Sequence, residues 1–153
     1  MSIAYRVQDY IAEQGLPWDP VMHRASHSAA ETSRVAGIPP DRLAKAVLLE
    51  DDAGYVMAVL AANRRLDLPE LDAALHRDLS LAREDELREL FSDCEPGALP
   101  PVGQAYGIPT LWDGALGSKA DVYFEGGDHR TLVHMSGADF CELMHSARKL
   151  ALS

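Results

Sequence analysis

The chain has 153 residues, of which 47% are hydrophobic, and its formal net charge is −10 at pH 7. This length and composition predict one domain with a full hydrophobic core. The negative charge argues against a protein that holds nucleic acid by bulk electrostatics, so any contact with RNA has to be local.

The cysteines and the apolar stretches indicate the cellular compartment of the protein. Cys94 and Cys141 are too few for a disulfide framework and lack the spacing of a zinc site, so reduced thiols are expected. No apolar stretch reaches the roughly 20 residues that span a membrane, and the N-terminus lacks a targeting pattern. The sequence therefore predicts a soluble, cytoplasmic protein.

The chain is expected to begin with a helix and a short strand. Apolar residues recur at helical spacing from Ile3 to Ile11, Ser2 is a candidate N-cap, and Gly15 fits the C-terminal stop. Prolines break the next stretch, and residues 21–23 are expected to form a short strand.

A second helix and a β-hairpin follow. Ser28 and Glu31 form a capping-box pattern, and Gly37 fits the end of this helix. Two apolar runs, residues 41–50 and 55–61, then flank an Asp-Asp-Ala-Gly linker. Short apolar runs separated by such a turn predict a buried hairpin.

Lys45 does not fit the first strand of this hairpin. It stands among Leu43, Ala44, Ala46 and Val47, where a charge is costly unless it is paired or reaches water. One interpretation is a strand lysine whose amine extends into solvent. The other is a lysine held in a pocket to meet an anionic or carbonyl-bearing ligand.

The middle of the chain predicts two more helices. Asp67 is an N-cap candidate, with a proline in the first turn and Glu70 three residues beyond the cap. Residues 79–81 are expected to form a brief strand, and residues 84–91 a helix with acidic residues in its first turn.

Residues 94–103 have a different composition, with three prolines and two glycines, which excludes a helix or a central strand. Glycine lets a ligand approach the backbone, and proline fixes the shape of the loop. Such a loop can aim N–H groups at a carbonyl oxygen or a phosphate. The available donors are Gly97, Ala98, Leu99, Val102 and Gly103. An ordinary proline-rich connector is the competing interpretation.

The C-terminal part predicts strands at residues 110–112 and 121–124, a turn at 126–128 and a further strand at 129–135. A last capping box starts at Ser136. Because regular βαβ alternation is absent, the predicted class is α+β, with a mixed, mostly antiparallel sheet and helices packed around it.

The six histidines give no metal motif. None lies in an HExxH pattern or pairs with a cysteine at zinc spacing. His129 and His134, five residues apart on one predicted strand, would point to opposite faces. Phosphate-binding glycine motifs and the serine nucleophile motif are also absent. We therefore expect no metal and no cofactor.

Three of these stretches together resemble the YbaK family, also called the prolyl-tRNA synthetase-associated editing domain family. Residues 42–49 resemble its lysine-bearing strand, and residues 97–101 resemble its GxxxP-type loop. Residues 126–129 lie where the family has a late glycine-containing turn, which carries a histidine in some members. The resemblance extends from about His27 to Met144.

The resemblance implies a trans-editing aminoacyl-tRNA deacylase domain over residues 1–153, with a curled sheet that approaches a barrel. Such an enzyme hydrolyses the ester between a wrong amino acid, such as alanine or cysteine, and the 3′ adenosine of a tRNA, most often tRNA(Pro). The implied partner is the acceptor end of aminoacylated tRNA, presented by prolyl-tRNA synthetase or an elongation factor. DNA and membranes are not expected partners.

The predicted catalytic residues are Lys45, Gly97 and His129. Lys45 would anchor the terminal nucleotide or the acyl carbonyl, the backbone of residues 97–103 would bind the adenosine and the oxyanion, and the tRNA 2′-hydroxyl would help to activate water. The other expected substrate contacts come from the loop and the late turn: Ala98, Leu99, Pro100, Pro101, Gly103, Gly127 and Asp128.

Two other classes of function remain open at this stage. One is a non-catalytic nucleotide- or protein-binding module on the same fold. The other is a Schiff-base enzyme that uses Lys45 on a carbonyl substrate, for which the sequence offers no evident acid–base partner.

Overall fold

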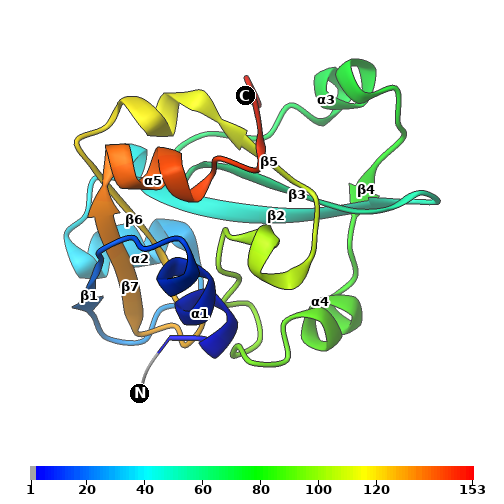
Figure 1. The fold of residues 1–153 in the computed structure, drawn as a ribbon. Helices are drawn as coiled ribbons and strands as arrows, with labels where there is room; N and C mark the ends of the chain where they lie inside the picture. The colour runs from blue at the N-terminus through cyan, green and yellow to red at the C-terminus, as the bar shows by residue number, and fades with distance from the viewer. Residues whose placement is uncertain (1–2) are drawn as a thin grey trace.

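The computed structural model describes residues 3–153 (Figure 1). Within this range the α-helices are α1 (Tyr5–Glu13), α2 (Ala29–Ala36), α3 (Leu68–Leu75), α4 (Glu84–Leu90) and α5 (Gly137–Leu143). The strands are β1 (Asp19–Met22), β2 (Leu43–Asp51), β3 (Gly54–Ala61), β4 (Ser80–Leu81), β5 (Thr110–Asp113), β6 (Asp121–Glu125), β7 (Thr131–Ser136) and β8 (Arg148–Leu150). Three short 3-10 helices, η1 (Pro40–Arg42), η2 (Gly103–Tyr106) and η3 (Gly114–Ser118), complete the order.

All the strands join one mixed sheet, in the order β1-β7-β6-β2-β3-β5-β8, with β4 paired to β2 beside this path. The pairs β2/β6, β3/β5 and β5/β8 are parallel, and the other four pairs are antiparallel. The predicted α+β class and the mixed, mostly antiparallel sheet are therefore confirmed. The sheet is not closed, because β1 and β8 are its edges.

The long β2–β3 hairpin crosses the molecule and carries the core on both of its faces (Figure 1). Along β3, Met57 and Val59 belong to one hydrophobic cluster, while Val56, Ala58 and Leu60 belong to the other. Alternate side chains of a strand point to opposite faces, so a continuous apolar run marks a strand that is covered on both sides. Burying each large apolar side chain contributes about 1.5–3 kcal/mol.

The helix ends follow the predicted chemistry. Ser28 accepts a hydrogen bond from the Glu31 amide at the start of α2, and Asp67 and Ser136 do the same for α3 and α5. Gly37 ends α2 in the left-handed conformation, with φ of 68°. The predicted cap Ser2 lies outside the described residues, and the N-cap position of α1 is occupied by Ala4.

One strand prediction was wrong and one strand was missed. The strand predicted over residues 129–135 begins only at Thr131, because His129 has φ of 61° and lies in the preceding turn. His129 and His134 therefore do not share a strand. Strand β8 was not expected, since its three residues gain their strand geometry only by pairing with β5. In the described part of the chain, no helix has the length and apolarity needed to cross a membrane.

Candidate functional site

Four of the predicted site residues line a single pocket of about 240 Å³: Lys45, Gly97, Leu99 and His129. They come from β2, from the proline-rich loop and from the turn between β6 and β7. The remaining walls come from the start of α2, from β2 and from the β6–β7 hairpin: His27, Ser28, Ala29, Thr32, Leu43, Ala44, Ala46, Glu125 and Leu132. Segments far apart in the sequence thus converge on one concave site.

Lys45 is half-buried and its Nζ donates one hydrogen bond, to the backbone carbonyl of Ala62 at 3.3 Å. No carboxylate among residues 3–153 forms an ion pair with it. Burial lowers the pKa of Lys45, and the nearby charge of Arg65 lowers it further. An amine in this setting can offer its charge to a ligand, which favours the pocket interpretation over a solvated strand lysine.

The proline-rich loop contains a tight turn over residues 95–98. The Ala98 amide donates to the Glu95 carbonyl at 3.0 Å, with Pro96 and Gly97 at the two central positions and φ of 83° at Gly97. Proline followed by a positive-φ glycine is the combination that a type II turn favours. The local sequence therefore dictates the conformation that brings Gly97 to the pocket.

The turn also decides which N–H groups a substrate can reach. The Ala98 N–H is used inside the turn, so it is not a donor for a ligand. The N–H groups of Gly97 and Leu99 have no acceptor in the described part of the chain, and both residues line the pocket. Two backbone donors on one rigid loop are the elements of an oxyanion-binding site.

His129 is held against this loop by its ring. Its Nε2 lies 2.6 Å from the carbonyl oxygen of Pro96, and a carbonyl can only accept, so Nε2 carries the proton. In the neutral ring, Nδ1 is then the nitrogen that can accept a hydrogen bond from substrate or water. The ring of His27 lies 5.1 Å away, centroid to centroid, at the start of α2.

The other predicted contacts are buried and do not line the pocket: Ala98, Pro100, Pro101, Gly103, Gly127 and Asp128. Gly103 is required by packing, because a Cβ there would collide with the Thr110 hydroxyl. Asp128 accepts hydrogen bonds from the Arg130 and Thr131 amides and from the Thr131 hydroxyl. These residues shape the loop and the turn, and their direct contact with substrate stays a prediction.

Four polar residues of the pocket were not predicted as site residues: Glu125, Thr32, His27 and Ser28. Glu125 ends β6 directly before the Gly126-Gly127 pair, and its Oε2 accepts from the Gly127 and His129 amides at 2.9 and 3.3 Å. Thr32 is buried on α2, where its hydroxyl donates to the Ser28 carbonyl at 2.9 Å. A carboxylate just before a glycine pair was the available sequence signal for Glu125. No local sequence signal marks Thr32.

The described residues contain no group of three or more His, Cys, Asp or Glu side chains that could hold a metal ion. The polar groups of the pocket are instead the Lys45 amine, two imidazoles, two hydroxyls, backbone N–H groups and the Glu125 carboxylate. Such a set suits an ester or another carbonyl compound that carries both positive and negative charge.

Comparison with known proteins points to one family. Residues 23–143 match the family model described as "Aminoacyl-tRNA editing domain". A solved structure described as a "putative trans-editing enzyme for prolyl tRNA synthetase" superposes with a TM-score of 0.83 at 25% identity, covering 98% of this chain and 96% of that one. No match was found among the curated proteins.

Two further solved structures share the fold. A hypothetical protein superposes with a TM-score of 0.81 at 25% identity, covering 94% of this chain and 97% of that one. A "putative signal transduction protein" from Marinobacter aquaeolei superposes with a TM-score of 0.76 at 25% identity. Here 97% of this chain corresponds to 30% of that chain, so the same fold also occurs as part of a longer protein.

Proposed function

This chain belongs to the aminoacyl-tRNA editing domain family, and we propose that it hydrolyses the ester of mischarged aminoacyl-tRNA in trans. The observation that carries the proposal is the convergence of Lys45, Gly97 and His129 on one small pocket. The proposal takes residues 1–153 as one editing domain that serves translation in the cytoplasm.

An aminoacyl ester is already reactive, so positioning and charge stabilisation supply most of the catalysis that is needed. The N–H groups of Gly97 and Leu99 would receive the carbonyl oxygen as it becomes an oxyanion. Lys45 would hold the terminal phosphate or the acyl carbonyl by its charge. The attacking water would be oriented by His129 Nδ1 and by the 2′-hydroxyl of the tRNA itself.

The walls of the pocket suit a small acyl group. Ala29, Ala44 and Ala46 line it, and its volume of about 240 Å³ must also admit part of the terminal ribose. Alanine and cysteine esters are therefore the proposed substrates, and tRNA(Pro) is the proposed carrier, in keeping with the name of the structural relative. If two amino acids differ by one methylene, the pocket can discriminate between their esters by only about 1–3 kcal/mol of transition-state binding free energy.

Because the chain is acidic, we propose that tRNA is captured through local contacts or is delivered by another protein. With a net charge of −10, it cannot gather tRNA by long-range attraction. We propose that it meets the acceptor end, presented by prolyl-tRNA synthetase or an elongation factor.

A deacylation screen tests this function. Purified protein is mixed with tRNA(Pro), tRNA(Ala) and tRNA(Cys), each charged with alanine, cysteine or proline, in the presence and absence of EDTA. We expect fastest release of alanine or cysteine from tRNA(Pro), little release of proline, and no effect of EDTA, because the pocket offers no metal ligand set. Binding of charged tRNA without hydrolysis of any ester would instead support a non-catalytic module.

A further inference from the structure

Among residues 3–153, the carboxylate of Glu125 has no charged partner. Its Oε2 accepts the Gly127 and His129 amides, whereas its Oε1 accepts no hydrogen bond from residues 3–153. Within the same range it forms no ion pair with a lysine, arginine or histidine. Since Glu125 is half-buried and lines the pocket, one carboxylate oxygen remains available to a ligand.

The position of the Glu125 carboxylate is fixed by its hydrogen bonds to the turn that follows β6. The two amides that bind Oε2 belong to the turn that presents His129, and the Glu95 amide ties this turn to the proline-rich loop through the Gly127 carbonyl at 2.7 Å. A partly desolvated carboxylate without a counter-charge is costly. A cationic ligand group placed beside Oε1 would remove that cost.

Among the residues that the structure describes, the pocket therefore carries the positive charge of Lys45 and the negative charge of Glu125, neither of which forms an ion pair. An aminoacyl ester of a nucleotide carries the same two charges, an α-ammonium and a phosphodiester. Lys45 repels the ammonium and attracts the phosphate, so the two ends of the ligand have one favourable orientation.

We propose that Glu125 binds the α-ammonium group of the aminoacyl ester and thereby selects free aminoacyl esters over neutral acyl esters. This inference rests on the proposed function and names one specificity-determining residue for it. The alternative is that Glu125 only caps the turn. A capping role would affect all ligands of the pocket equally, whereas recognition of the ammonium affects only those that carry one.

The test uses two stable ligands of nearly equal size. One is adenosine with L-alanine joined to its 3′ position by an amide, and the other is the lactyl counterpart, in which a hydroxyl replaces the α-amine. Dissociation constants are measured by calorimetry at pH 6.5, where the amine is protonated. We expect wild type to bind the alanyl ligand at least ~10-fold more tightly, the ratio typical of a charge-assisted hydrogen bond.

Three variants separate recognition from folding. Glu125→Gln keeps an oxygen for the turn amides and is expected to bring the ratio close to one. Glu125→Asp keeps the charge and should retain part of the preference. Glu95→Gln, which removes an exposed carboxylate outside the pocket, should keep the wild-type ratio.

The inference is overturned if wild type shows no preference, or if Glu125→Gln keeps the wild-type ratio. Hydrolysis of alanyl-tRNA by wild type is measured in parallel. Hydrolysis without an effect of Glu125 on the ratio would remove this inference alone. Absence of both hydrolysis and ligand binding would remove the proposed function and the inference with it.

Discussion

The amine of Lys45 makes a single hydrogen bond, to the backbone of Ala62, and no ion pair within the described range. Its charge therefore contributes little to folding. Lys45→Met keeps the aliphatic stem and should change the free energy of unfolding by no more than about 1 kcal/mol. Loss of the charge from the pocket should lower kcat/KM for alanyl-tRNA by about 100-fold or more.

Lys149→Met is the matched control for this prediction. Lys149 is exposed, with its Nζ 5.8 Å from the centroid of the Trp112 ring, and it does not line the pocket. This variant removes the same charge and should deacylate like wild type. Unchanged turnover in a folded Lys45→Met protein would contradict the assignment of Lys45.

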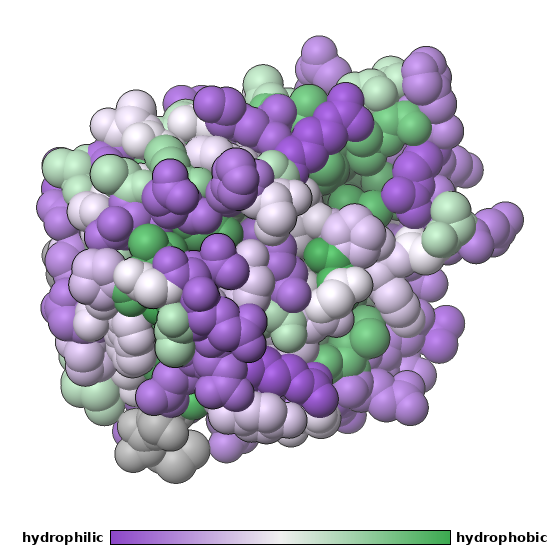
Figure 2. Space-filling model, in the orientation of Figure 1, coloured by the Kyte–Doolittle hydropathy of each residue, from purple (hydrophilic) through white to green (hydrophobic). Residues whose placement is uncertain are grey.

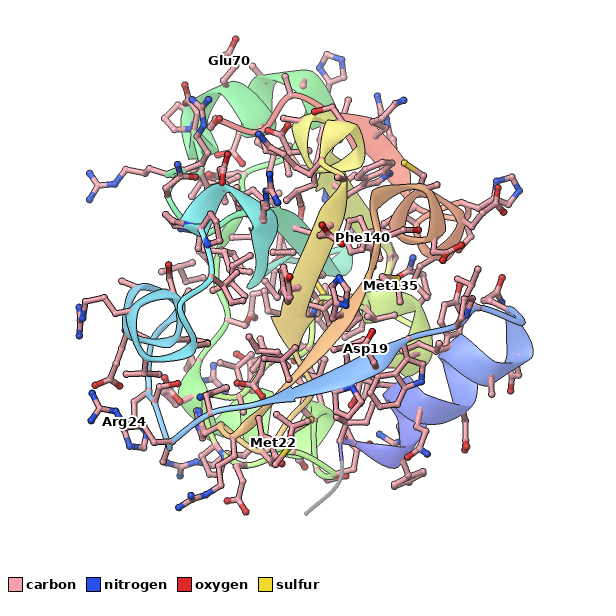
Figure 3. All side chains as sticks on the ribbon, turned by 90° about the vertical axis from the view of Figure 1, so that its left-hand side faces the viewer. Asp19, Met22, Arg24, Glu70, Met135 and Phe140 are labelled. Atoms are coloured by element: carbon pink, nitrogen blue, oxygen red, sulfur yellow. The ribbon has the colours of Figure 1, made fainter. Side chains whose placement is uncertain are left out.

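The ring of His134 on β7 forms hydrogen bonds with two carboxylates. Its Nδ1 lies 2.9 Å from Asp19, labelled on β1 in Figure 3, and its Nε2 lies 2.8 Å from Asp121 on β6. Both ring nitrogens must donate to satisfy these acceptors, so the arrangement suits the protonated ring. Burial opposes the charge, but the hydrogen bonds to Asp121 and Asp19 outweigh it and raise the pKa of His134.

The sign of the pH effect follows from the direction of this shift. A pKa that is higher in the folded state than in the unfolded state stabilises the fold below about pH 6.5, and this contribution is lost as the pH rises through the folded pKa. We expect the free energy of unfolding, measured in urea, to fall by roughly 0.5–1 kcal/mol between about pH 6 and 8. In His134→Gln this decrease should be absent; an equally steep decrease in that variant would contradict the role of His134.

At the scale of elements, the proline-rich loop gives the site a turn with a positive φ at Gly97 and leaves room beside the His129 ring. Gly97 has φ of 83°, and a Cβ there would lie 3.6 Å from Cε1 of His129. Gly97→Val adds branched bulk beside the His129 ring and strains the turn that brings Gly97 and Leu99 to the pocket. We expect kcat/KM for deacylation to fall at least tenfold, a threshold set below the 10²–10³ typical of a lost oxyanion donor.

Gly107 supplies the control for backbone strain. It also has a positive φ, 68°, but nothing lies within 4 Å of its Cβ position and it does not line the pocket. Gly97→Val and Gly107→Val should both lose about 1–2 kcal/mol of stability, the usual cost of a side chain in the left-handed region. Only the first should lose activity. Near-normal activity of Gly97→Val would show that the loop is a connector, and equal losses of activity in both variants would attribute the loss to backbone strain.

At the scale of the molecule, acidic residues outnumber basic ones, with 24 Asp and Glu against 14 Lys and Arg. Hydrophilic residues cover most of the face shown in Figure 2, and the net charge is −10. Lys45 lines the pocket, the charge of Arg65 acts on it, and neither side chain forms an ion pair with residues 3–153. With this net charge, we expect only a small area of contact with tRNA phosphates.

Such a surface predicts a weak dependence of activity on salt. Two phosphate contacts give a slope of about −1 to −2 for log kcat/KM against log salt concentration. The measurement is deacylation of alanyl-tRNA between about 50 and 300 mM KCl. A slope steeper than about −4 would reveal an extended tRNA-binding face and would contradict capture through the acceptor end alone.

The sequence by itself determined the features that depend on close neighbours in the chain. The β2–β3 hairpin follows from two apolar runs around a turn, and the caps of α2 and α3 follow from Ser28 and Asp67. The conformation at Gly97 follows from the Pro-Gly pair. Each of these depends on hydrogen bonds or side-chain alternation within a few residues, so the local pattern is sufficient.

Only the tertiary structure decided which of these pieces meet. The parallel pairing of Leu43 with Tyr123 brings β2 beside β6, and this places Lys45 and Glu125 around one pocket. Strand β8 and the position of the His129 ring likewise depend on distant partners, Leu111 in β5 and the Pro96 carbonyl. Local propensity carries no information about such pairings, because their free energy comes from contacts that exist only after the chain has folded.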